Sequence, residues 1–280
     1  MTHLRQAGAQ GFYPTSPDDL RVEVDSLLVP GAPKMRVIAV VVPHAGYRYS
    51  GKVAGAVFSK IEFPDTFVIV GPDHTGLGAD GAIMIEGAWE TPHGKVEIDV
   101  DLAQTILSRT QALESDPLGH PNEHSIEVQL PLLQGFNRRF QFVPIHLSPN
   151  NEYPTCEDIG HCVAEAIQAS KKSVVVVAST DMTHCGRAYQ LPPRGMAAHE
   201  FAIMQDRKAI EAILALNPAK LYMTARQEQV SMCGLTTTTS TLVAAKELGG
   251  KGVEIISYRT SGDVTKDSET VVGYAGILIH

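Results

Sequence analysis

The sequence has few cysteines, few basic side chains and no long apolar segment, and each shortage excludes a class of protein. No stretch approaches the roughly 20 apolar residues of a transmembrane helix, and residues 1–11 lack the apolar core of a signal peptide. Lysine and arginine number 23 against 31 aspartates and glutamates, which gives a formal charge of −8 without any basic cluster. This balance argues against nucleic-acid binding and against attachment to anionic membranes.

The four cysteines form no CxxC pair in a chain of 280 residues. A long, cysteine-poor chain without a secretion signal is most simply a reduced intracellular protein, so we expect a cytoplasmic location. Motifs for phosphate binding and serine hydrolysis are missing too. No GxGxxG or GxxxxGK[ST] follows a predicted strand, and no GxSxG elbow is present.

Strands and helices alternate along the chain, and 44% of the residues are hydrophobic. This pattern predicts an α/β fold, a single-domain α/β/α sandwich over residues 1–280 with a mostly parallel central sheet. Residues 89–94 predict a turn, and a helix is expected to begin within 122–131. The other predicted strands are 36–42, 66–70, 82–86, 140–145, 173–178, 253–259 and 271–279, and the other predicted helices are 17–28, 51–61, 99–110, 156–170, 195–214, 218–226 and 235–248.

Three of the predicted strands are followed within a few residues by a histidine. His44 follows the strand 36–42, His74 follows 66–70, and His184 follows the valine run of 173–178. Apolar runs of this kind are typical of parallel strands buried on both faces, and in such sheets the ligand crevice lies outside the carboxyl ends of the strands. Three histidines at equivalent positions therefore predict one convergent site.

The residues near these strand ends supply donors for a metal ion. His44, His74 and His184 offer nitrogen, Cys233 offers sulfur and Asp181 offers oxygen. Imidazoles suit iron, copper and zinc, and a thiolate favours softer ions such as Cu(I), Zn or Fe. Against this, any single histidine could be a hydrogen-bonded loop residue, and Cys233 could be a small buried side chain.

Two further stretches allow alternative interpretations. Glu123 and His124 could form a proton-transfer pair beside the site, or Glu123 could be a charge that favours the start of a helix. The hydroxyl-rich run 236–241 could present a polar face to the site, although a packed helix is the simpler interpretation.

Five motifs occur in the order seen in the Memo family, which the sequence resembles from about Phe12 to its end. In prokaryotes the resemblance is to the AmmeMemoRadiSam system protein B. The motifs are Pro43-His44-Ala45-Gly46-Tyr47, Gly71-Pro72-Asp73-His74-Thr75-Gly76, Glu123-His124-Ser125-Ile126-Glu127, Ser179-Thr180-Asp181-Met182-Thr183-His184 and Met232-Cys233-Gly234.

The family is similar in fold to the catalytic subunit of class III extradiol dioxygenases, which are non-haem iron enzymes that open catechol rings. The resemblance implies that His44, His74 and Cys233 are the primary metal ligands. It also implies that His184 faces or joins the metal, with Asp181 beside it. The dioxygenases use a carboxylate where this sequence has Cys233, and a thiolate changes the charge and redox behaviour of the ion. Ring cleavage therefore does not follow from the resemblance.

The first functional hypothesis is a cytoplasmic oxidoreductase that uses non-haem iron or copper and acts on an unknown small-molecule substrate. In it His184 is a base oriented by Asp181, His124 takes part in proton transfer, and Tyr47 and Glu123 contact the substrate. The family's system name implies an AMMECR-type domain protein and a radical-SAM protein as partners. The alternatives are a non-catalytic protein- or peptide-binding module on an inherited dioxygenase fold and, less simply, a zinc hydrolase.

Overall fold

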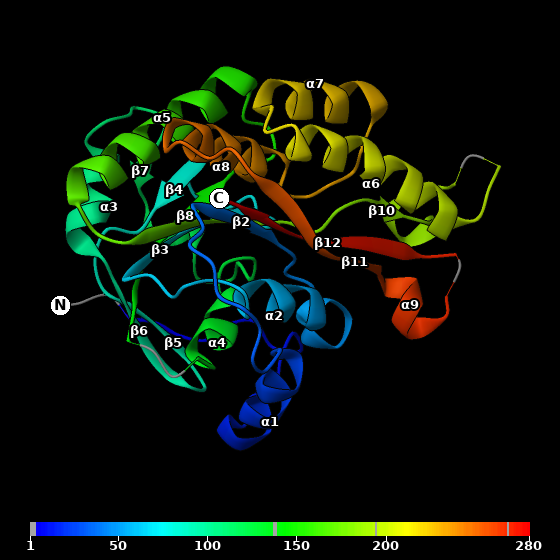
Figure 1. Ribbon diagram of the computed structural model, residues 1–280, viewed down its shortest axis with the longest axis horizontal. Coiled ribbons are helices and arrows are strands. Elements are labelled where there is room, and N and C mark those ends of the chain that lie inside the picture. Colours follow the sequence, from blue (N-terminus) through cyan, green and yellow to red (C-terminus); the bar gives the residue numbers. More distant parts are fainter. Residues whose placement is uncertain (1–3, 137–138, 194, 268) are drawn as a thin grey trace.

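A computed structural model describes residues 4–136, 139–193, 195–267 and 269–280, and its centre is a large twisted sheet (Figure 1). The neighbouring strands β6, β8, β3, β9 and β2 are all parallel. This confirms the predicted α/β fold with a mostly parallel sheet. Along the sheet the order is β1 (Leu4–Arg5), β5 (Ala88–Thr91), β6 (Gly94–Ile98), β8 (Gln141–Leu147), β3 (Thr66–Pro72), β9 (Val174–Ser179), β2 (Ala39–Val42), β12 (Val271–Ile279) and β10 (His184–Cys185).

Three shorter or peripheral strands complete the sheet in the part of the chain that is described. β11 (Val253–Thr260) runs antiparallel to β12, and β4 (Gly81–Ile83) runs antiparallel to β8. β7 (Glu114–Ser115) pairs with β4.

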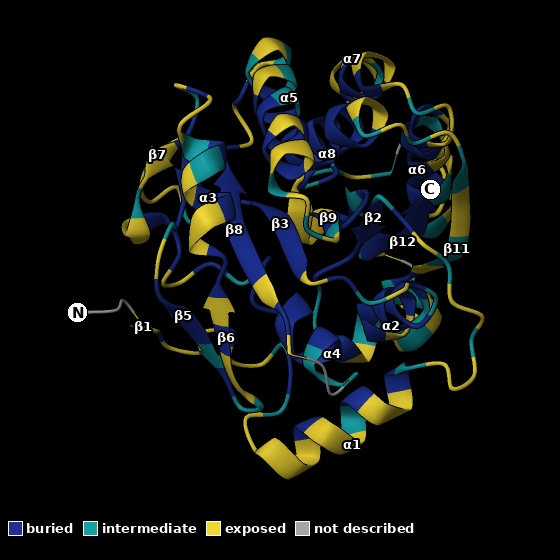
Figure 2. Ribbon diagram, turned by 60° about the vertical axis from the view of Figure 1, so that its left-hand side comes forward, coloured by how far each residue is buried: buried dark blue, intermediate teal, exposed yellow. Residues whose placement is uncertain are grey.

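The strands β2, β3 and β9 end at the same edge of the sheet. Their registers place Val42 of β2 opposite Ser179 of β9, and Val70 of β3 opposite Ala178 of β9. Their side chains are almost wholly buried because helices cover both faces (Figure 2). The loops that carry His44, His74 and Asp181 therefore leave the sheet side by side.

The helices form two layers around the sheet (Figure 1). One face is covered by α1 (Pro17–Leu27), α2 (Lys52–Phe58) and α4 (Gln129–Gln134), and the other by α3 (Val100–Leu107), α5 (Tyr153–Ser170), α7 (Pro218–Glu228) and α8 (Leu235–Glu247). α6 (Ala198–Leu214) packs on α7 and reaches β10, β11 and β12, and α9 (Ser261–Thr265) lies at the end of β11. None of the helices in these described ranges is long and apolar enough to cross a bilayer.

The hydroxyl-rich run of α8 is packed rather than exposed. All six side chains from Thr236 to Thr241 are buried. α5 lies close against this helix at Gly160, where a Cβ atom would stand 2.5 Å from the Cβ of Val243 and 2.6 Å from the carbonyl oxygen of Ser240. The close contact needs glycine on one helix and small residues on the other.

Two predictions of local structure were wrong in instructive ways. Residues 89–94 do not form a simple turn, because Ala88–Thr91 and Gly94–Ile98 pair as a hairpin that buries Trp89. The helix expected within 122–131 begins only at Gln129. The residues before it form turns, because Glu123 and Ser125 bond to other loops instead of to a helix. The short elements β1, β7, β10 and α9 carry too few residues to show a periodic pattern.

Candidate metal site

His44, His74 and Cys233 meet at the carboxyl edge of the parallel strands. One potential ligand atom from each of the three lies within 4.8 Å of the others. The Cys233 Sγ lies 3.3 Å from Nε2 of His44. His44 and His74 follow β2 and β3, and Cys233 stands just before α8. Three loops far apart in sequence thus place two imidazoles and a thiol around one point.

The ring of His44 is held by a hydrogen-bond network behind it. Its Nδ1 lies 2.9 Å from the Ser179 Oγ, which donates its only proton to the carbonyl oxygen of Ser125 at 2.6 Å. Ser179 must therefore accept from His44 Nδ1–H, as it does from the amide of Gln129 at 2.9 Å. This fixes the tautomer of His44 and leaves Nε2 with a lone pair toward Cys233.

His74 is oriented in the same way by Glu123. The carboxylate of Glu123 accepts from the backbone N–H of His74 at 2.5 Å and lies 3.0 Å from its Nδ1. It also accepts from the amides of His124 and Ser125, so the carboxylate ties two loops together. The close approach of these loops needs Gly71, where a Cβ atom would stand 2.4 Å from the Ser125 Oγ. Glu123 is 1% exposed and positions His74 instead of lining the cavity.

The protonation of His74 and that of Cys233 each depend on the contact between the two side chains. Burial lowers the pKa of His74, but the hydrogen bonds to Cys233 and Glu123 outweigh burial and raise that pKa to about 10. Burial raises the pKa of the Cys233 thiol, and His74 acts against this rise. The backbone N–H of Asp181 donates to the Cys233 Sγ at 3.2 Å. A metal ion here would displace a proton from the His74–Cys233 pair, because only deprotonated donors bind metals.

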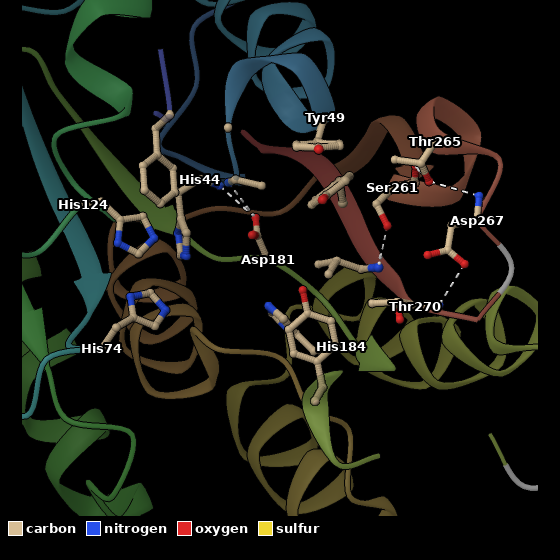
Figure 3. Close-up of a pocket in the computed structure, with 16 residues that line it drawn as sticks. His44, Tyr49, His74, His124, Asp181, His184, Ser261, Thr265, Asp267 and Thr270 are labelled. Atoms are coloured by element: carbon tan, nitrogen blue, oxygen red, sulfur yellow. Dashed lines mark hydrogen bonds between the residues drawn. The ribbon is translucent and has the colours of Figure 1, made fainter. Parts of the chain in front are cut away.

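Asp181 lies beside His44 in the same cavity, and His184 lies on the side of Asp181 that faces away from His44 and His74 (Figure 3). The Nδ1 of His184 lies 2.9 Å from the carbonyl oxygen of Met182 and 3.1 Å from that of Ser231. Both partners are acceptors only, so Nδ1 carries a proton and Nε2 is the nitrogen without a partner in these bonds. Among the described residues, the nitrogens of His184 do not lie within 4.8 Å of the other donor atoms as a set. A direct bond from His184 to the metal therefore stays a prediction.

Asp181 does not hold His184, which corrects the expectation that it orients that ring. Its Oδ1 instead accepts from the backbone N–H groups of His44 and Ala45 at 2.9 and 3.3 Å. Asp181 thereby fixes the start of the His44 loop. Burial raises the pKa of this carboxyl, against the effects of His184 and the two amides.

His124 forms the wall between the ligand candidates and the N-terminal segment. Its ring stacks on His74 at a centroid distance of 4.7 Å and on Phe12 at 4.2 Å. Burial lowers its pKa to about 4, with Glu123 acting in the opposite direction. With His74 and Glu123 it makes a second group of possible metal donors, but Glu123 in that group is already bonded to both loops.

The cavity in front of the cluster has a volume of about 480 Å³. Tyr49, Tyr189 and Tyr274 also line the cavity. Tyr49 and the hydroxyl side chains of α9 and the following loop lie on the side away from His74 and His124 (Figure 3). Tyr47, expected to contact a substrate, is 1% exposed and donates its hydroxyl proton to the carbonyl oxygen of Val128 at 2.7 Å. The structure places it in the core behind the cavity, where it packs the His44 loop.

Several residues of the site carried no recognisable signal in the sequence. Ser179, Gln129 and Ser231 act by bonding to groups on other loops, and neither spacing nor composition reveals such contacts. The hints for Ser179 are its place at the end of a valine strand and its place as the first residue of the motif 179–184, and neither reveals its bond to His44.

The donors fit a transition-metal ion on chemical grounds. The buried imidazole of His44 and the more exposed imidazole of His74 have their outer nitrogens fixed by Ser179 and Glu123, and a thiol stands close to their inner nitrogens. Ligand histidines in metalloproteins are normally held by such outer partners. Two nitrogens and one sulfur suit zinc, copper and iron better than magnesium or calcium.

Fold and site together define a class: an α/β/α protein with a His/His/Cys donor set at the carboxyl edge of its parallel strands. A family model described as Memo-like protein matches residues 3–278. The chain belongs to the Memo family.

Curated relatives extend over almost the same length. The chain is 40% identical to a MEMO1 family protein of Methanopyrus kandleri over 288 residues, which cover 98% of each chain. It is 36% identical to one from Methanothermobacter thermautotrophicus and 35% identical to one from Nitrosopumilus maritimus. These alignments cover 97% of this chain and 98% of the Methanothermobacter protein, and 95% of each chain for Nitrosopumilus.

Among solved structures, the chain is similar to an uncharacterized protein of Escherichia coli K12. The TM-score is 0.52 at 13% identity, and the match covers 86% of this chain and 99% of that one. At this identity the likeness concerns the fold alone.

Proposed function

We propose that this protein is a metal-dependent oxidoreductase that holds one non-haem iron or copper ion through His44, His74 and Cys233. The observation that carries the proposal is the convergence of the three donors, with both imidazoles oriented by buried partners, at the base of a cavity. A site of this volume admits a small molecule. Zinc fits the same donors, and it would move the proposal from redox chemistry to hydrolysis.

When bound, the ion would supply a redox-active Lewis acid to a small substrate in the cavity. Residues of the chain itself would transfer a proton, hold the ligand loop and exclude water. His184 would act as a base through Nε2, because the carbonyl groups of Met182 and Ser231 hold its Nδ1–H. Asp181 holds the His44 loop, and the stacked rings of Phe12 and His124 close one side of the cavity against water.

The test is the metal content of protein purified without oxygen, with His44→Ala and His161→Ala beside it. His161 is a half-exposed histidine of α5 that pairs with Glu247, away from the site, so it controls for adventitious binding by surface imidazoles. About one equivalent of iron or copper, kept in His161→Ala and lost in His44→Ala, supports the proposal. Equal metal in both variants, or none in any sample, contradicts it.

A second candidate is a binding module for a protein or peptide, and one observation favours it. Besides the two histidine ligand candidates, the cavity is lined by three tyrosines and several hydroxyl groups, which is the kind of surface that binding sites use. This candidate requires partner binding that is the same with and without metal. Partner binding that depends on the metal would count against it.

We also propose a cytoplasmic location and a role in the AmmeMemoRadiSam system. Four free cysteines in the described chain agree with a reducing compartment. The partners to test are an AMMECR-type domain protein and a radical-SAM protein from the same organism. Co-purification of either with the tagged full-length chain supports the role, and separate elution of both counts against it.

A further inference from the structure

The N-terminal segment, residues 5–13, is bonded into the loop that orients the candidate ligands. This loop, residues 120–128, carries two glutamates that face opposite ways. Glu123 faces His74 and fixes its ring. Glu127 faces the N-terminal segment and is fully buried. One loop thus joins the metal cluster to the beginning of the chain.

Glu127 is saturated by donors from the N-terminal segment. Its carboxylate accepts from the backbone N–H groups of Gly8 and Ala9, both at 2.9 Å, and from the hydroxyl of Tyr13. Arg5 completes the set with an ion pair whose side chains are 4% and 0% exposed. At Gly8 a Cβ atom would stand 2.9 Å from the carbonyl oxygen of Pro121, so the two backbones lie in close contact.

Arg5 reaches past Glu127 to the backbone of the same loop. Its Nε donates to the carbonyl oxygen of His120 and its Nη2 to that of Glu123, both at 2.7 Å. The guanidinium lies 4.1 Å from the centroid of the Trp89 ring, which fixes its plane. The planar guanidinium of Arg5 therefore donates to two carbonyl oxygens and one carboxylate at the same time. The single ammonium group of a lysine cannot reach all three acceptors in this geometry.

The same segment also touches the cavity. The ring of Phe12 stacks on His124, and the carbonyl oxygen of Phe12 accepts from the backbone N–H of Tyr47 at 2.8 Å. The segment therefore contacts both the His44 loop and the Glu123 loop.

We propose that residues 5–13 are an integral part of the metal site, and that Arg5 is a positioning residue that sets His74 through the backbone and carboxylate of Glu123. The inference rests on the proposed metal site. Its consequence is that the chain's beginning controls metal affinity although none of its residues reaches the cluster as a ligand.

The test uses Co²⁺ binding to the full-length protein, followed by competition with a chelator and by the visible spectrum of the Co²⁺ form. Arg5→Met together with Glu127→Gln removes both charges of the buried pair, so that neither is left unpaired. We expect this variant to fold but to bind Co²⁺ roughly 10- to 100-fold more weakly, with a changed spectrum at saturation, because it frees Glu123, the outer partner of His74, and loss of such a partner has effects of that size.

Arg5→Lys, which keeps the charge but not the fork of donors, should fall between the double variant and the wild type. Arg21→Met is the matched control, since Arg21 is exposed on α1 and pairs only with Asp18 among the described contacts. Loss of affinity with an altered spectrum in the Arg5 variants, but not in the control, supports the inference. If the double variant fails to fold, the Co²⁺ affinity and the visible spectrum of Arg5→Lys decide whether Arg5 positions His74.

Two results would overturn the inference in different ways. A folded double variant whose affinity and spectrum match the wild type shows that Arg5 has no positioning role while the metal site stands. A wild-type protein that takes up no Co²⁺ shows that the proposed metal site itself is wrong.

Discussion

Each ligand candidate is held by a residue from another loop. Ser179 holds His44 and Glu123 holds His74, so the rings are oriented before any ion arrives. Those partners explain why both ring nitrogens of each histidine have a defined role. Asp181 bonds to the backbone of the His44 loop instead of to His184.

Ser179→Ala is the residue-scale prediction. It removes the acceptor for His44 Nδ1–H, so we expect metal affinity to fall by about 10- to 100-fold. It also leaves the amide of Gln129 and the carbonyl of Ser125 without their shared partner, which should cost about 1–3 kcal/mol of unfolding free energy. Metal titration and urea unfolding measure the two effects separately.

Ser59→Ala is its control. Ser59 is equally buried and makes two hydrogen bonds, to Gly55 and Val29, away from the site. It should lose stability without losing metal affinity. Equal affinities in the Ser179 and Ser59 variants would show that orientation of His44 does not matter for binding.

At the scale of elements, the sequence predicted most of the strands and helices that show a periodic apolar pattern. The valine runs of β2 and β9, and the helices from α5 to α8, follow from apolar patterns and lie close to the expected residues. The hairpin around Trp89 was missed because strands of four and five residues resemble a turn with flanking residues. The contacts of the 120–128 loop were missed because side chains that bond across loops leave no periodic trace.

The threonines of α8 give a prediction about packing. The Thr238 Oγ1 is buried and finds no partner among the residues described, whereas Thr239 Oγ1 donates to the carbonyl oxygen of Leu235 at 2.8 Å. Thr238→Val replaces an unpaired hydroxyl with a methyl group of similar size, so it should be about 1 kcal/mol more stable than Thr239→Val. Urea unfolding of the two variants compares them directly, and the opposite order would contradict this account of the helix.

Asp99 gives a prediction about pH. It caps α3 through the N–H of Leu102 and bonds Lys172 at 2.8 Å and Thr66 at 2.7 Å. Burial raises the pKa of Asp99, but these bonds, with that of Lys172 foremost, outweigh burial and hold the pKa below its usual value. The ionised carboxylate therefore stabilises the fold above the unfolded pKa of about 4 and ceases to do so as pH falls through the lower folded pKa.

Asp99→Asn should consequently be less stable than the wild type at pH 7, and the difference should shrink as the pH falls below about 4. Urea midpoints of both proteins between pH 7 and pH 3 measure this. A difference that stays constant over the range would show that the charge of Asp99 contributes nothing.

For the molecule as a whole, the register of the parallel strands β2, β3 and β9 brings the residues of the candidate metal site together. Because Val41, Val70 and Ala178 lie at one level of the sheet, the loops that follow bring His44, His74 and Asp181 together, and Cys233 is added from the residues just before α8. The sequence could predict the histidines from their place after strands. It placed Glu123 beside the site but as a substrate contact, not as the partner that orients His74. It could not predict that the beginning of the chain completes the site, since that depends on packing between distant segments.

X-ray absorption at the metal edge, on wild-type protein loaded with iron, copper or zinc and on Cys233→Ala, tests the central claim most directly. The account predicts a sulfur neighbour at about 2.3 Å and imidazole nitrogens at about 2.0 Å in the wild type, with the sulfur absent from the variant. A metal surrounded only by nitrogen and oxygen, unchanged by Cys233→Ala, would show that the ion is not held by His44, His74 and Cys233.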